Sequence, residues 1–151
     1  ARNKTPVLYN GKEDDIQIGK GVVLREGSDV AIIACGVLVH ESLEAAEKLS
    51  AEGIEATVVD MHTIKPLDTD LIDALAARCG AIVTAEDHSV IGGLGGAVAE
   101  HVVGSTPVPI EKIGVQDRFG ESAGAEEMLE MMGLKSHHIC DAVKSVIARK
   151  V

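Results

Sequence analysis

The hydrophobic and polar positions of this chain alternate between short unbroken apolar runs and longer stretches with apolar residues every three or four positions. The unbroken runs occupy residues 29–35, 54–61 and 81–85. Runs of this length are typical of strands that are buried on both faces of a parallel sheet. A fourth run, residues 110–115, follows Pro107 and Pro109. This predicts a strand at the sheet edge, because proline cannot donate a ladder hydrogen bond.

The stretches between these runs predict helices, because their apolar residues fall on one face at a period of 3.6 residues. Gly53 is placed to end the first of them. Asp68 or Thr69 is expected to cap the second helix, and Ser136 the last one. The predicted helices cover residues 39–52, 70–79, 97–103, 125–132 and 136–149.

The first 28 residues are polar and contain several glycines, which predicts a connecting arm with short strands at residues 16–18 and 21–25. A turn at residues 26–29 would let the second of these pair antiparallel with the apolar run that follows. From there on, strands and helices alternate at spacings that fit βαβ crossovers. The pattern therefore predicts a doubly wound α/β domain, mostly parallel, with one antiparallel strand.

Composition narrows the classes of function. The 151 residues fit one domain, with 46% apolar residues, no Trp, one Tyr and one Phe. Because the chain lacks aromatic platforms and basic patches and has a formal charge of −10, we expect no nucleic-acid partner. The longest apolar run, residues 30–39, is too short for a membrane span, so no membrane partner is expected. Three widely spaced cysteines are typical of reduced thiols in a cytoplasmic protein.

A glycine-rich segment follows the run at residues 81–85. The backbone N–H groups of the helix after it could bind a phosphate, or the small residues could let that helix pack closely on the sheet. The G-x-G-x-x-G pattern fails, because Val98 stands at the position of the third glycine, and no Walker-type loop is present. Close packing is therefore the favoured interpretation. The glycines are Gly92, Gly93, Gly95 and Gly96.

Three charged residues stand between the strand and the glycines. Glu86, Asp87 and His88 lie where the carboxyl end of a strand could present a general acid or base. They could equally mark the point where a buried strand reaches solvent. The sequence leaves both interpretations open.

The last predicted helix contains a weak metal-binding pattern. His137 and Cys140 are three residues apart, and His138 is adjacent to the first of them. Two ligands at helical spacing are a weak signal when no second pair accompanies them. We therefore expect a small buried thiol and no metal site.

A polar loop at residues 116–124 contains the single phenylalanine of the chain. Asp117, Arg118 and Phe119 form its centre. An exposed phenylalanine beside an arginine would suit a docking loop, since such residues anchor interfaces. Alternatively, Phe119 could pin a solvated loop to the core. The sequence does not separate these two interpretations.

Four segments carry a family resemblance. They are IGKGVVLREGSDVAIIACG, EAAEKLSAEGIEATVVDMHTIKPLD, IVTAEDHSVIGGLGGAVAE and IGVQDRFGESA. In this order they resemble the C-terminal domain of transketolases, which also closes 1-deoxyxylulose-5-phosphate synthases and the β subunits of 2-oxo acid dehydrogenase E1 enzymes. The ending DRFGESA is most similar to transketolases. The resemblance implies a three-layer αβα domain over residues 21–151, with a mostly parallel five-stranded sheet and one antiparallel strand. Residues 1–20 would be an arm from a preceding pyrimidine-binding domain plus linker.

The resemblance also implies a function. It indicates part of a thiamine-diphosphate enzyme that transfers two-carbon ketol units between sugar phosphates, as in the pentose phosphate pathway. Thiamine diphosphate and Mg²⁺ would be bound by other domains, leaving no cofactor, metal or catalytic residue in this chain. The chain begins without Met, so we expect a domain or split subunit that is inactive alone. Its expected partners are a second copy in a homodimer and the thiamine-binding domains or subunit. The family's identifying loop, with a structural or interface role, is formed by Glu86, His88, Gly92, Gly93, Gly95 and Gly96.

One residue role follows from the resemblance. Arg2 stands four residues before Pro6 and matches an arginine that contacts the substrate phosphate at the end of the middle domain. A planar guanidinium suits bidentate phosphate binding. Two alternatives remain for the whole chain. It could be the assembly module of a 2-oxo acid dehydrogenase E1 β subunit or deoxyxylulose-phosphate synthase, with an acyltransferase partner in some E1 enzymes. The glycine segment could also bind a small anionic effector.

Overall fold

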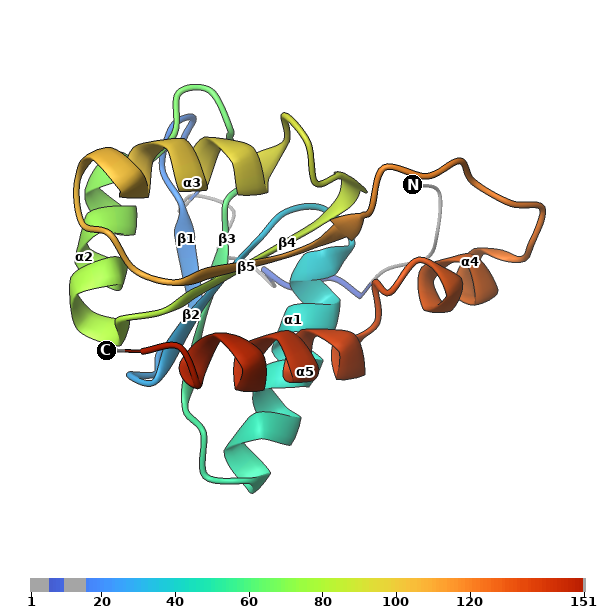
Figure 1. Cartoon of the computed structure of the whole chain (residues 1–151), viewed down its shortest axis with the longest axis horizontal. Helices are drawn as coiled ribbons and strands as arrows, with labels where there is room; N and C mark the ends of the chain where they lie inside the picture. The colour runs from blue at the N-terminus through green and yellow to red at the C-terminus, as the bar shows by residue number, and fades with distance from the viewer. Residues whose placement is uncertain (1–5, 10–15, 151) are drawn as a thin grey trace.

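The computed structural model describes residues 6–9 and 16–150, which form one mixed sheet flanked by helices (Figure 1). Within these described ranges, no helix is both long and apolar enough to cross a bilayer. In chain order the elements are β1 (Val22–Arg25), β2 (Val30–Ala34), α1 (Leu38–Ala51), β3 (Ala56–Asp60), α2 (Thr69–Cys79), β4 (Ile82–Ser89), α3 (Leu94–Gly104), β5 (Ile110–Val115), α4 (Ala125–Met131) and α5 (Ser136–Ile147).

The sheet has five strands in the order β1-β3-β2-β4-β5. Strands β3, β2, β4 and β5 are parallel, and β1 runs antiparallel to β3. This confirms the predicted fold class. The central strand β2 is fully buried because its side chains alternate between two apolar layers. Ile32 points into the layer of one face and Ile33 into that of the other, as the period of two in a strand requires.

Helices cover both faces of the sheet. Helices α1 and α5 lie on one face, and α2 and α3 on the other (Figure 1). Helix α4 extends away from the sheet and contains no buried residue. Its Met128 and Leu129 are only partly buried where they pack against the core layer of α1 and α5. Helix α4 is therefore the least anchored of the described helices.

Two predictions for the N-terminal arm are wrong. Residues 16–18 form no strand, because Ile18 is exposed and enters a turn completed by Gly19 at φ +82°. The predicted strand at residues 21–25 exists as β1, but it pairs with β3 and not with the run that follows. The physical reason is that β3 and β4 already occupy both edges of β2.

Other boundaries also differ from the sequence prediction. Strand β4 continues to Ser89, and α3 begins at Leu94, so the charged residues lie in the strand and two glycines lie in the helix. In α5, Ser136 is the first helical residue and Lys135 is the N-cap. The Ser136 N–H group donates to the carboxylate of Glu41 instead, at 2.7 Å.

Candidate functional site

The carboxyl ends of β2, β3, β4 and β5 meet at one edge of the sheet, which we call the carboxyl edge. Ligand sites of open α/β sheets lie outside such edges. Here Cys35 follows β2, Asp60 ends β3 and Glu86 lies in β4. The glycine segment then leads from β4 into α3 (Figure 1). The carboxyl edge is therefore the first place to look for a site.

The N-terminus of α3 is occupied by a carboxylate of the chain itself. Glu86 is only 1% exposed, and its two oxygens accept hydrogen bonds from Leu94 N at 2.9 Å and Gly95 N at 2.8 Å. A carboxylate at this position satisfies helix N–H groups that otherwise lack partners, and it lies at the positive end of the helix dipole. These two donors are not free for an external phosphate.

The glycines make this arrangement possible. A Cβ atom on Gly93 would lie 2.0 Å from Oε2 of Glu86, and one on Gly95 would lie 2.8 Å from Oγ1 of Thr84. Gly92 has φ +75°, which other residues rarely adopt. Gly96 has no neighbouring atom within 4 Å of its added Cβ. The close-packing interpretation thus agrees with Gly93 and Gly95, but not with Gly96.

The carboxyl edge disfavours ionisation of its thiol. Burial, followed by the nearby carboxylates of Glu86, Asp87 and Asp60, raises the pKa of Cys35 to about 12. The thiolate is the nucleophilic form of cysteine, so this thiol is inert at neutral pH. The pKa of Tyr9 is also raised, by burial and by its hydrogen bond to Asp60 Oδ2 at 2.5 Å. Neither group is activated for chemistry.

Of the charged residues Glu86, Asp87 and His88, only His88 has a mostly exposed side chain. Its side chain is 68% exposed, and Nδ1 lies 3.3 Å from Oδ1 of Asp87. The Asp87 carboxylate in turn lies beside Gly36, where an added Cβ would approach it to 3.3 Å. Of the two interpretations left open by the sequence, the buried Glu86 fits a structural role, whereas His88 is free to contact a partner.

The structure brings two separately predicted loops together. A cavity of about 310 Å³ contains Glu86, His88, Gly92 and Gly93 among its lining residues, and a second of about 350 Å³ lies against residues 117–119. Ser89 lines both cavities. Pairing of the ends of β4 and β5 joins the two loops, which is a long-range contact that sequence spacing does not reveal.

The loop at residues 116–124 presents its aromatic residue to solvent. Phe119 is 97% exposed, which excludes the interpretation that it pins the loop to the core. Arg118 Nε lies 3.1 Å from the sulfur of Met132, and its Nη2 donates to the carbonyl of Met131. The residue before it, Asp117, has φ +46°. Arg118 therefore holds the loop to α4 while Phe119 projects outward.

Sequence reasoning missed the exposed aliphatic residues of the carboxyl edge. Ile64 and Ile91 both line the smaller cavity and are 39% and 66% exposed. Each follows the end of a strand, where an apolar residue looks like part of the core. Together with Phe119 they give this edge an apolar character that is typical of contact surfaces.

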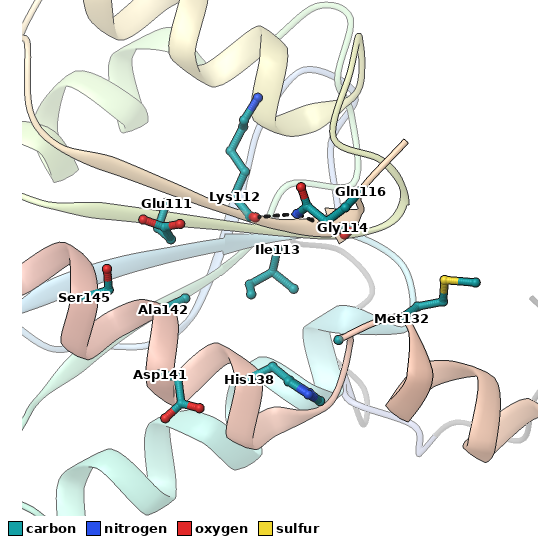
Figure 2. Close-up of a pocket in the computed structure, with 11 residues that line it drawn as sticks. Glu111, Lys112, Ile113, Gly114, Gln116, Met132, His138, Asp141, Ala142 and Ser145 are labelled. Atoms are coloured by element: carbon teal, nitrogen blue, oxygen red, sulfur yellow. Dashed lines mark hydrogen bonds between the residues drawn. The ribbon is translucent and has the colours of Figure 1, made fainter. Parts of the chain in front are cut away.

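The remaining predicted residues lie elsewhere. Arg2 is outside the described residues. Cys140 is buried with its sulfur toward the carbonyl of Ala45, whereas His137 is exposed, so these two do not form a metal-binding face. A third cavity of about 380 Å³ lies between the edge strand β5 and α5 (Figure 2). Glu111 and Asp141 are among its lining residues.

Comparisons with known proteins give a family match and several relatives. The model for the C-terminal domain of transketolase matches residues 19–139. The 6-deoxy-6-sulfo-D-fructose transketolase subunit SqwH of Clostridium sp. (strain MSTE9) is 44% identical, over 95% of this chain and 45% of its own length. A putative transketolase C-terminal section of Methanocaldococcus jannaschii is 43% identical, over 94% of this chain and 45% of its own.

Two other similarities extend this comparison. The 1-deoxy-D-xylulose-5-phosphate synthase of Trichormus variabilis is 43% identical, over 96% of this chain and 23% of its own length. A solved structure, described as a split gene transketolase in an inactive beta4 tetramer, is 45% identical and superposes with a TM-score of 0.95. The match covers 99% of this chain and 49% of that one. The chain thus spans less than half the length of each of these relatives.

Proposed function

The chain belongs to the transketolase C-terminal domain family, and from this premise we propose that it is the C-terminal domain or subunit of a thiamine-diphosphate-dependent transketolase. Such an enzyme moves two-carbon ketol units between sugar phosphates in cytoplasmic carbohydrate metabolism. Two relatives named as transketolase parts, matched over 94–95% of the chain, support the assignment. Thiamine diphosphate and Mg²⁺ bind in other domains of the same enzyme, outside this chain.

The observation that carries the proposal is which side chains of the carboxyl edge are already engaged within the chain and which are exposed to solvent. The buried carboxylate of Glu86 already accepts hydrogen bonds from the N-terminus of α3. The raised pKa of Cys35 keeps its thiol protonated and therefore unreactive at neutral pH. What the edge offers to solvent includes three apolar side chains, Ile64, Ile91 and Phe119, beside the exposed His88. This combination suits a surface that contacts protein. Neither the Cys35 thiol nor the Glu86 carboxylate is available there as a nucleophile.

The role of the chain is then assembly of the enzyme. The related solved structure is described as a tetramer of β chains, which supports self-association in this family. We assign the carboxyl edge to contact with the thiamine-binding part of the enzyme or with a second copy in a homodimer. Burying the 97%-exposed Phe119 contributes about 1.5–3 kcal/mol to such a contact.

A reconstitution assay tests the proposal. The chain is mixed with the polypeptide that carries the thiamine-binding domains, thiamine diphosphate and Mg²⁺. Ketol transfer is measured with a panel of ketose phosphates and 6-deoxy-6-sulfo-D-fructose as donors. We expect transfer by the mixture and none by the chain alone. A mixture that transfers no ketol group from any donor refutes the assignment.

Variants test the surface itself. Phe119→Ser and Ile91→Ser should each raise the concentration for half-maximal reconstitution by roughly tenfold or more, from the lost apolar burial. Val103→Ser is the matched control, because Val103 is 76% exposed at the opposite end of α3. If all three variants reconstitute alike, the carboxyl edge is not the contact surface.

A second candidate follows from the other relatives. Several 1-deoxy-D-xylulose-5-phosphate synthases are 41–43% identical over most of this chain. The same reconstituted mixture can be assayed for 1-deoxy-D-xylulose 5-phosphate as product. Its formation without ketol transfer would assign the chain to a synthase and leave its role in assembly unchanged.

A further inference from the structure

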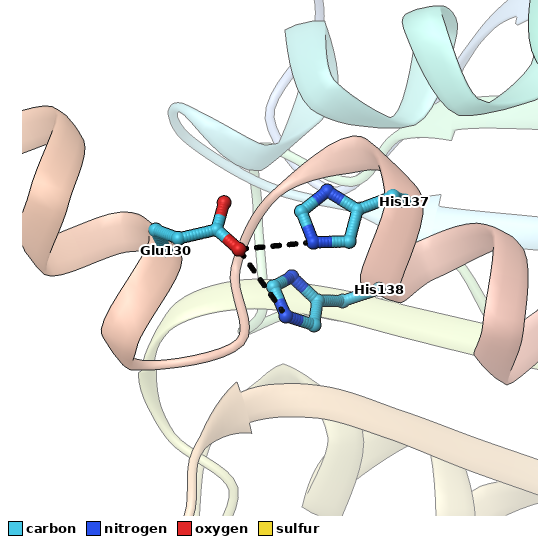
Figure 3. A group of neighbouring side chains, drawn as sticks. All are labelled: Glu130, His137 and His138. Atoms are coloured by element: carbon cyan, nitrogen blue, oxygen red, sulfur yellow. Dashed lines mark ion pairs between the residues drawn. The ribbon is translucent and has the colours of Figure 1, made fainter.

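Three side chains from two helices point toward one another where α4 meets α5. Glu130 comes from α4, and His137 and His138 come from the first turn of α5 (Figure 3). The Nε2 atoms of His137 and His138 lie 3.0 Å and 3.9 Å from the same oxygen, Oε1 of Glu130. We propose that these three residues bind a divalent transition-metal ion, with Zn²⁺ as the best-suited ion, and that the ion joins α4 to α5.

The distances fit such an ion. The three ligand atoms all lie within 4.8 Å of one another. A tetrahedral Zn²⁺ with bonds of about 2.1 Å would hold its ligand atoms roughly 3.4 Å apart. Two of the pairs are already within half an ångström of that spacing. The side chains of Glu130 and His137 are more than half exposed, so small rotations complete the geometry without repacking the core.

The donor set selects the class of metal. Two imidazole nitrogens and one carboxylate oxygen suit Zn²⁺, Ni²⁺ or Cu²⁺, whereas Mg²⁺ and Ca²⁺ require mostly oxygen ligands. Two histidines and one glutamate also form a recurrent three-ligand set for zinc, with a fourth position left to water. The position of the cluster on the surface leaves that fourth position open to solvent.

The surrounding charges permit a cation. A helix N-terminus repels cations, but the N-terminus of α5 is neutralised by Glu41, which accepts from Ser136 N at 2.7 Å. Lys135, the residue before α5, directs its ammonium group to Glu41 at 2.6 Å and Glu126 at 3.0 Å. The chain as a whole has a formal charge of −10, which favours cation binding.

One hydrogen bond must be given up. Lys135 N donates to Nδ1 of His138 at 3.4 Å, which places the proton of a neutral ring on Nε2. Metal binding through Nε2 moves that proton to Nδ1 and breaks the bond. At 3.4 Å the bond is long and weak, so its loss subtracts little from the affinity.

The consequence is a metal-dependent clamp on α4. This helix contains no buried residue, so a bond between Glu130 and α5 would fix its C-terminal end. The next residue, Met131, accepts a hydrogen bond from Arg118 of the loop that carries Phe119. By restraining α4, the proposed ion would also restrain the loop that Arg118 attaches to this helix. The site does not depend on the proposed function of the chain.

Calorimetric titration of Zn²⁺ into the full chain, prepared without a polyhistidine tag, tests the site. We expect one equivalent to bind, and we expect Glu130→Gln and His137→Asn each to weaken that binding by about tenfold or more. His40→Asn is the matched control: His40 pairs with Glu44 at 3.1 Å, but no second histidine lies in that pair. The control should bind Zn²⁺ as the wild type does.

The imidazole proton NMR signals of His137 and His138 provide a second measurement. In the wild type, one equivalent of Zn²⁺ should shift both sets of signals and leave those of His40 unchanged. The proposal is overturned if no single equivalent binds. It is equally overturned if Glu130→Gln and His137→Asn bind as tightly as wild type, or if the shifts appear only at other histidines.

Discussion

The glycines at the start of α3 allow a direct test of how Glu86 is used. Gly93→Ala adds a Cβ atom 2.0 Å from Oε2 and 2.7 Å from Cδ of Glu86, so the carboxylate must leave its two hydrogen bonds. The backbone itself tolerates alanine, because Gly93 has φ −98°. Gly96→Ala is the matched control, since an added Cβ meets no atom within 4 Å.

The two substitutions should change the free energy of unfolding in opposite directions. Hydrogen bonds to a charged group contribute about 1.5–3 kcal/mol each, so displacing Glu86 costs up to roughly 3–6 kcal/mol. Alanine restricts the unfolded chain more than glycine does, and this offsets about 0.4–1 kcal/mol of the cost. We therefore expect Gly93→Ala to lower the free energy of unfolding by about 3 kcal/mol. Gly96→Ala should raise it by about 0.5–1 kcal/mol, because alanine favours the helix.

Urea unfolding followed by far-ultraviolet circular dichroism measures both effects, since the chain has no tryptophan to report fluorescence. A double-mutant cycle isolates the contact. In a Glu86→Ala background the carboxylate is gone, so Gly93→Ala should cost less than about 1 kcal/mol. The reasoning is refuted if Gly93→Ala stays within about 0.5 kcal/mol of wild type, or if its cost is the same in both backgrounds.

Two further predictions concern titration. Since the folded pKa of Cys35 is raised to about 12, the folded thiol stays protonated while the unfolded thiol ionises near pH 8.5. The contribution of the protonated thiol to the free energy of unfolding should therefore be lost as pH rises toward 12. The urea midpoint should fall less steeply with pH in Cys35→Ala than in the wild type. Burial alone would raise the pKa of Asp68, but hydrogen bonds from Gly21 N, Lys20 and Leu71 N together lower it. Its contribution, about 1–2 kcal/mol for a helix cap, should be present above about pH 4 and lost as pH falls below it. Thermal unfolding of Asp68→Ala should therefore differ from wild type at pH 7 and converge on it at low pH, and a constant difference would contradict this.

The sequence predicted the sheet well because the central strands are buried on both faces. Unbroken runs such as that of β2 are typical of strands covered by two layers, and the structure confirms that β2 is fully buried. The pairing of β1 with β3 was beyond the sequence, because it is decided by which edges β2 leaves open. Edge choice of this kind depends on the whole sheet and leaves no local pattern.

The site was predictable only in part. The sequence groups Glu86 with the glycines in one loop because they are close in the chain, but it does not predict that the Glu86 carboxylate points toward α3. The meeting of the glycine segment with Phe119 depends on the pairing of β4 and β5. The cluster of Glu130 with His137 and His138 depends on how the turn between α4 and α5 brings the end of one helix beside the start of the other. The phosphate role of Arg2 and the boundary between residues 1–20 and 21–151 stay predictions.

The bond between Glu86 and the start of α3 also constrains how this sequence can change over time. Because the side chain of Glu86 fills the space that any Cβ at Gly93 would need, neither position can vary freely while the other is kept. A mutation to a larger residue at position 93 becomes acceptable only after a shorter residue has replaced Glu86, and that first step removes the helix cap. The two positions therefore evolve as one unit, because a route from one acceptable pair to another passes through the loss of that cap.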